Sequence, residues 1–139
     1  MKYLLLIVSV IAGLFIISFI TEAIEFTTIL NISNLSMSEL YRNQPLYLEL
    51  RNQTHILVFK LFYTTMAGII GGYVAVFISH YFKKTAVFSL MILQTASLIW
   101  AAFFSGLSAS LPLWIWILLI ISVPSGIFVG YRLSIQRLK

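Results

Sequence analysis

Two carboxylates near the end of the first long apolar segment are the residues best suited to chemistry in this chain. Glu22 and Glu25 are three positions apart, so a helix places them on one face. A rise of about 1.5 Å per residue puts them about 27 to 32 Å along that helix, and Lys60 reaches a similar height on the next apolar segment. The sequence therefore predicts a polar cluster at one membrane boundary. Its members are Glu22, Glu25, Lys60, Tyr63 and His55.

Ionisable side chains at this depth are rare and usually face protein or water, which makes the cluster a candidate functional site. The interpretation that the sequence favours is structural, with an ion pair that fixes the register of two helices. Transport or ligand binding is the alternative. A metal site built from Glu22, Glu25 and His55 is a third interpretation, because carboxylates and imidazole bind several divalent ions. No ligand spacing supports it, so we expect no metal and no cofactor.

Catalytic motifs are missing from the sequence. It contains no Ser/His/acid set, no glycine-rich phosphate loop and no zinc motif. The absence of cysteine excludes disulfides, thiolate metal ligands and a cysteine nucleophile. We therefore expect no catalytic residues and favour a protein that is not an enzyme.

The composition indicates an integral membrane protein. The chain has 139 residues, of which 60% are hydrophobic and 9% charged, and its mean hydropathy is +1.01. A spanning helix needs about 20 mainly apolar residues, and four stretches qualify. They predict an all-α chain with a single domain over residues 1–139, an antiparallel bundle of four transmembrane helices. The helices are expected at about 4–29, 57–82, 86–104 and 112–132.

The connection over residues 30–56 is the largest segment outside these helices. Ser36 with Glu39 fits a capping box, and Asn43 with Pro45 fits a second helix start. Its many leucines are typical of a segment that lies on the membrane interface or covers the bundle. We expect a short interfacial helix here.

The distribution of basic residues predicts the orientation. Six lie on the side of the two termini: Lys2, Lys83, Lys84, Arg132, Arg137 and Lys139. The other three lie on the opposite side, so the positive-inside rule places both termini in the cytoplasm. Basic residues that flank spanning helices meet anionic headgroups, and we expect the lipid bilayer as partner and no nucleic acid.

Small residues follow one face of the second and fourth spanning segments. They are Gly68, Gly71, Gly72 and Ala75 in the second and Ser122, Gly126 and Gly130 in the fourth. Such stripes let helix backbones approach closely. They serve packing within a chain and oligomerisation alike, and we favour packing.

Short motifs in three of the segments carry a resemblance to known proteins. They are Thr21-Glu22-Ala23, Gly71-Gly72-Tyr73-Val74-Ala75, Pro112-Leu113-Trp114 and Pro124-Ser125-Gly126. With this combination the chain resembles small four-helix integral membrane proteins of bacteria to which no activity is assigned. The resemblance spans most of the chain and implies a four-helix fold in the bacterial inner membrane. It carries no catalytic or binding residue across.

Three functions from different classes fit these features. The leading one is a non-enzymatic assembly or accessory subunit, whose small-residue stripes bind its own helices and those of another membrane subunit or a second copy. The first alternative is a small oligomeric transporter or channel that uses Glu22 and Glu25 as coupling or selectivity carboxylates. The second is a lipid- or quinone-binding membrane protein or enzyme with a pocket between its helices.

Overall fold

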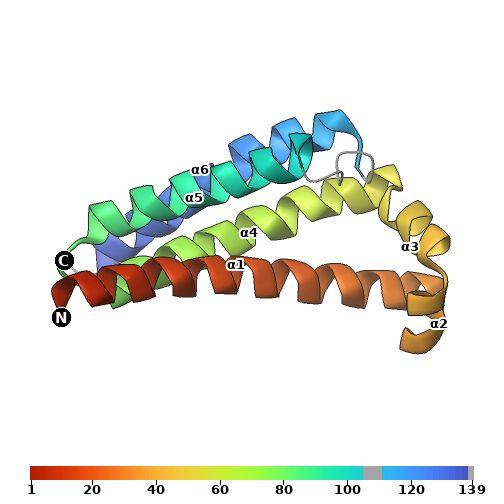
Figure 1. The fold of residues 1–139 in the computed structure, drawn as a ribbon, viewed down its shortest axis with the longest axis horizontal. Coiled ribbons are helices and arrows are strands. Elements are labelled where there is room, and N and C mark those ends of the chain that lie inside the picture. Colours follow the sequence, from red (N-terminus) through yellow and green to blue (C-terminus); the bar gives the residue numbers. More distant parts are fainter. Residues whose placement is uncertain (105–110, 138–139) are drawn as a thin grey trace.

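The computed structural model describes residues 1–104 and 111–137, and its regular elements are all helices (Figure 1). Four of them are long and apolar enough to cross a membrane. These are α1 (Lys2–Ser33), α4 (Thr54–Ile78), α5 (Lys83–Phe103) and α6 (Leu113–Arg137). Two short helices, α2 (Met37–Arg42) and α3 (Gln44–Arg51), form a cap between α1 and α4. Both termini lie at one end of the molecule, which is here called the terminal end. The cap lies at the opposite end, which is here called the cap end.

The long helices differ from the expected ranges at their ends. The first helix runs on past residue 29 to Ser33, where Asn34 ends it in the left-handed conformation with φ of 54°. The second ends at Ile78 instead of residue 82. Residues 79–82 form the turn before α5, and Phe82 stacks on Tyr3 with ring centroids 5.5 Å apart. The aromatic residues Tyr81 and Phe82 lie in this turn and continue the apolar pattern of α4. The sequence therefore predicted a second helix that is four residues too long at this end.

The cap contains two helices, and the local signals seen in the sequence start both. Ser36 accepts a hydrogen bond from Glu39 N, and the Glu39 carboxylate accepts one from Ser36 N. The Ser36 hydroxyl also donates to the Glu39 carboxylate at 2.6 Å, and this hydrogen bond together with the one from Ser36 N lowers the pKa of Glu39. Asn43 accepts from Leu46 N and so caps α3, which has a proline in its first turn. The capping box predicted from the sequence therefore forms.

Helices α4 and α6 pack with their backbones in close approach. The glycines at this contact are Gly68 and Gly72 on α4 and Gly126 and Gly130 on α6. A Cβ atom added to Gly126 would lie 2.5 Å from the carbonyl oxygen of Thr65, and one added to Gly68 would lie 2.8 Å from that of Val123. Because neither distance leaves room for a methyl group, the glycines allow these two helices to pack inside the monomer.

The remaining small residues have different neighbours. A Cβ added to Gly71 would meet the side chain of Ile17 on α1, and Ala75 is buried. Ser122 is only half-buried, and its hydroxyl has no hydrogen-bond partner among the described residues. The stripe on α4 therefore contacts both α1 and α6.

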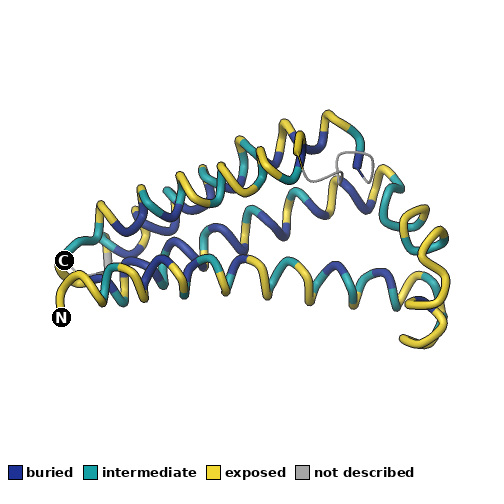
Figure 2. Tube along the Cα trace, in the orientation of Figure 1, coloured by how far each residue is buried: buried dark blue, intermediate teal, exposed yellow. Residues whose placement is uncertain are grey.

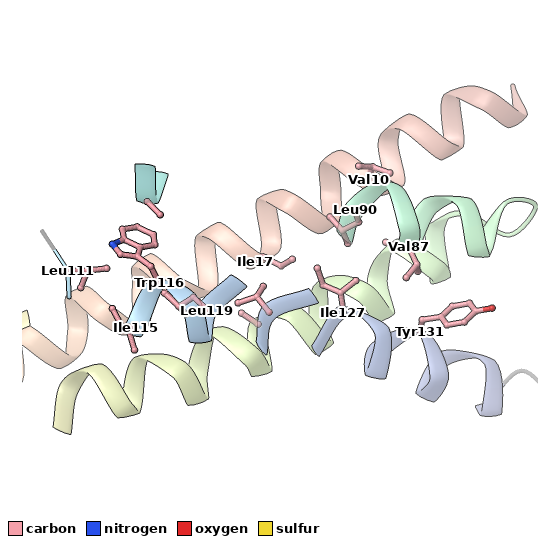
Figure 3. Packing of buried hydrophobic residues seen from close by; sticks show 14 of the residues in the cluster. Val10, Ile17, Val87, Leu90, Leu111, Ile115, Trp116, Leu119, Ile127 and Tyr131 are labelled. Atoms are coloured by element: carbon pink, nitrogen blue, oxygen red, sulfur yellow. The ribbon is translucent and has the colours of Figure 1, made fainter. Parts of the chain in front are cut away.

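The buried residues lie along the inner faces of the long helices (Figure 2). They form one hydrophobic cluster that runs from Val10 and Leu90 to Trp116 and Ile115 (Figure 3). Helices α1 and α5 touch near the terminal end, where a Cβ on Gly13 would lie 2.7 Å from Leu90, and they diverge toward the cap end (Figure 1). The close apolar contact between α1 and α5 therefore lies toward the terminal end, while Ile29 of α1 is buried at the cap end.

We expect Gly130→Ala to lower the free energy of unfolding by about 1 to 3 kcal/mol, because its methyl group would press on the backbone of α4 at Ile69. Gly13→Ala is the matched control, since its methyl would meet mainly the flexible Leu90 side chain and alanine favours a helix. Thermal unfolding in one detergent, followed by circular dichroism, measures both. Equal stability of the two variants would contradict the close α4–α6 contact.

Candidate functional site

A buried carboxylate on α1 is the centre of a polar network at the cap end. The Glu25 side chain is only 3% exposed. Its Oε2 accepts hydrogen bonds from Lys60 Nζ and, at 3.1 Å, from the Tyr63 hydroxyl. Its Oε1 lies 2.7 Å from Arg51 Nε and accepts a hydrogen bond of 3.4 Å from the Tyr47 hydroxyl. One carboxylate therefore joins α1 to α3 and α4, and these five residues are here called the Glu25 network.

Helical spacing positions the partners of Glu25. Lys60 and Tyr63 are three positions apart on α4, and Tyr47 and Arg51 are four apart on α3, so each pair projects from one helix face. Lys60 is itself only 6% exposed. Arg51 is more accessible, with 20% of its side chain exposed. The network is therefore closed on the α4 side and open at its α3 edge.

Charge balance explains why Glu25 tolerates burial. An isolated buried carboxylate costs several kcal/mol, and paired cations with further hydrogen bonds offset that cost. Burial, with the charge of Glu25 as the next cause, raises the pKa of Tyr47 to about 12. The Tyr47 phenol is therefore protonated near neutral pH and donates to the carboxylate.

The structure brings together three of the five residues expected in the polar cluster, namely Glu25, Lys60 and Tyr63. Glu22 is exposed and pairs with no described residue, because the three-residue spacing turns it about 60° around α1 from Glu25. His55 is exposed as well, since it lies about 140° around α4 from Lys60. The hydrogen-bonded network therefore contains three of the five expected residues. Among the described residues, no three His, Asp or Glu side chains could hold a metal ion.

Two members of the Glu25 network, Tyr47 and Arg51, were not expected in the cluster. The signal that could have found them is their four-residue spacing inside the predicted interfacial segment, which places a phenol and a guanidinium on one face. What the sequence did not show is that this face turns back toward the bundle.

A cavity of about 230 Å³ lies between α1, α4, α5 and α6, next to the Glu25 network; it is here called the inter-helix cavity. Arg51, Lys60 and Glu22 contribute charged groups to its lining. Its other polar lining residues are Ser18, Thr21, Thr64, Gln94 and Ser97. Its apolar lining residues include Ile17, Leu98, Leu119 and Val123. The cavity is therefore amphipathic.

Exposure shows where the inter-helix cavity opens. Ser18 and Glu22 on α1 and Ser97 on α5 line it and are exposed, while Ile17 and Leu119 are buried. The opening therefore lies between α1 and α5, the two helices that diverge toward the cap end (Figure 1).

Trp116 is a third residue whose role the sequence did not reveal. It is only 6% exposed and lines the inter-helix cavity from α6 (Figure 3). Its Nε1 is buried without a hydrogen-bond partner among the described residues. Buried indole N–H groups are usually paired, so this donor is a candidate contact for a ligand.

The fold and the site define a class of protein. The chain is all-helical, four of its helices can span a membrane, and large apolar side chains such as Phe15, Phe19, Ile92 and Ile121 are exposed on their outer faces. These are features of a polytopic membrane protein. In the comparisons with known proteins, no family model, curated protein or solved structure matches the chain. Its function is therefore argued from its own geometry.

We expect Glu25→Gln to lower the free energy of unfolding by about 3 to 5 kcal/mol, because it leaves the buried Lys60 ammonium without an anionic partner. The matched control is Glu22→Gln, an exposed carboxylate on the same helix, which should change stability by less than about 0.5 kcal/mol. The double variant Glu25→Leu/Lys60→Met should recover much of the loss, since it removes both charges. Thermal unfolding in detergent measures all three, and equal stability of Glu25→Gln and Glu22→Gln would rule out the proposed charge pairing.

Proposed function

We propose that this protein binds an amphipathic molecule of the membrane, a lipid or a quinone, in the inter-helix cavity, and that it is not an enzyme. The observation that carries the proposal is the lining of the cavity. Ser18, Gln94 and Ser97 line it with groups that can donate hydrogen bonds, next to Arg51, Lys60 and Trp116. Ile17, Leu119 and Val123 form an apolar wall. A ligand with oxygen acceptors on its head and a hydrocarbon tail matches both.

The size and the opening of the cavity support a ligand that comes from the bilayer. Its volume of about 230 Å³ is below the range of about 300 to 1,000 Å³ typical of pockets that enclose a whole small molecule. The cavity therefore fits a headgroup or a ring, while the tail leaves between α1 and α5. Polar side chains at membrane depth are costly when they face hydrocarbon, so a ligand over Ser18 and Ser97 would also lower that cost.

The proposed location is a bacterial inner membrane, with both termini in the cytoplasm and the cap on the opposite side. The basic residues Lys2, Lys83, Lys84 and Arg132 support this orientation, since they cluster at the terminal end. Lys2 also lies over the ring of Tyr81, 5.0 Å from its centroid, as in an interfacial aromatic and basic belt. Lys139 lies outside the described residues.

The other two functions have less support from the geometry. An assembly subunit would offer small-residue stripes to a partner, but Gly68, Gly72 and Gly126 are already covered by helices of the same chain. The transporter alternative uses Glu22 and Glu25, but Glu25 is held by two cations and does not line the cavity, which leaves Glu22 as the accessible carboxylate of the two. A polypeptide that co-purifies over the α1–α5 opening would return support to the assembly function.

We expect the protein, purified in a mild detergent, to retain a lipid or quinone that native mass spectrometry detects. Ser97→Phe should lower the bound fraction about tenfold, because the ring would obstruct the opening at a cost of about 1.4 kcal/mol or more. The matched control is Ile92→Phe, on the same helix and outside the cavity lining, which should retain the ligand. Equal retention by both variants would overturn the assignment of the inter-helix cavity.

A further inference from the structure

A second cavity, of about 240 Å³, lies on the cap side of α1; it is here called the cap cavity. Its lining residues are Glu22, Phe26, Leu40, Tyr41, Gln44 and Tyr47. They come from α1, α2 and α3, so the cavity forms only when the cap folds back against α1. Ligand binding in the inter-helix cavity, as proposed above, does not involve the cap cavity.

We propose that the cap cavity binds an organic ammonium group, with the Glu22 carboxylate as its counter-ion and aromatic side chains around it. Three of the six lining residues are aromatic: Phe26, Tyr41 and Tyr47. The rings of Phe26 and Tyr41 lie against each other, with centroids 5.8 Å apart and planes tilted by 38°. Aromatic faces attract ammonium groups, and cages of this type recognise alkylated ammonium ligands.

The charges around the cap cavity favour a cation. Glu22 has no hydrogen bond or ion pair to a described residue, so its charge is available to a ligand. Glu25 and Arg51 also act on Tyr47, but they are paired with each other at 2.7 Å. Among the lining residues, Glu22 alone carries a formal charge. The one formal charge of the lining is therefore negative, while the neighbouring Glu25 network, with Lys60 and Arg51 against one carboxylate, carries one net positive charge.

The position of the cap cavity suits a lipid headgroup. Glu22 lies about 27 Å along α1, near the boundary of a hydrocarbon layer of about 30 Å, which is the level at which headgroups begin. Leu40, only 2% exposed, gives the cavity an apolar side, and Glu22, Tyr41 and Gln44 are exposed at its mouth. An ammonium group carried by an ethanolamine or choline lipid would reach it from the bilayer. A free amine in solution would reach it from the mouth.

Native mass spectrometry of the full chain with short-chain lipids tests the proposal. The probes are dioctanoyl phosphatidylethanolamine, which carries an ammonium group, and dioctanoyl phosphatidylglycerol, which does not. We expect at least about tenfold preference for the ethanolamine lipid, and Glu22→Gln should reduce that preference to about one. Tyr41→Leu should weaken it roughly fivefold through loss of the aromatic face. The matched control Glu49→Gln, an exposed carboxylate on α3 outside the lining, should leave it unchanged.

Addition of tetramethylammonium chloride separates the two sources of the ligand. If it displaces the ethanolamine lipid, the site accepts any organic ammonium; if it does not, the site requires the lipid that carries the group. Equal binding of the two lipids by the unmodified protein, or an undiminished preference in Glu22→Gln, would overturn the proposal. Tyr41 lines the cap cavity and not the inter-helix cavity. A ligand that the Tyr41→Leu variant retains and the Ser97→Phe variant loses therefore belongs to the inter-helix cavity. The two proposals can therefore fail separately.

Discussion

The ion pair between Glu25 and Lys60 is the interaction on which the cap end of this protein depends. Helix α1 diverges from α5 toward that end (Figure 1), where buried apolar residues such as Ile29 and Leu40 are joined by a polar connection from α1 to α3 and α4. A carboxylate that is 3% exposed supplies the connection, because a buried charge is stable only with its partners in place. Two cations and two phenols meet that requirement and fix both the distance of α1 from α4 and the placement of α3.

The two cavities follow from this arrangement. Where α1 and α5 diverge, the inter-helix cavity remains between the helices, and where the cap returns across α1, the cap cavity forms. Glu22 lines both, on a helix that separates the two spaces, and it shares the lining of the inter-helix cavity with Lys60 and Arg51. The Glu25 network fixes α1 relative to α3 and α4 without filling either cavity, so it holds the helices that line both cavities in place.

The other half of the molecule is held by a different force. In lipid there is no hydrophobic drive that brings two apolar helices together, so association depends on close packing. The glycines of α4 and α6 permit that packing, and Gly13 and Gly71 do the same where α1 meets α4 and α5. The molecule thus combines close backbone packing toward the terminal end with polar pairing at the cap end.

The sequence by itself determined the class of fold and the local features. Hydropathy and length specify four helices able to cross a membrane, and short-range signals specify the starts of α2 and α3, since both depend on residues close together in the chain. It also indicated Glu25, Lys60 and Tyr63 as neighbours, because helical rise sets their heights. Only the tertiary structure decided which way each side chain faces. It left Glu22 and His55 outside the Glu25 network, added Arg51 and Tyr47 to it, and buried Trp116 in the wall of the inter-helix cavity. Rotation of one helix about its axis and the return of the cap are set by contacts between distant segments, which spacing along a single helix does not encode.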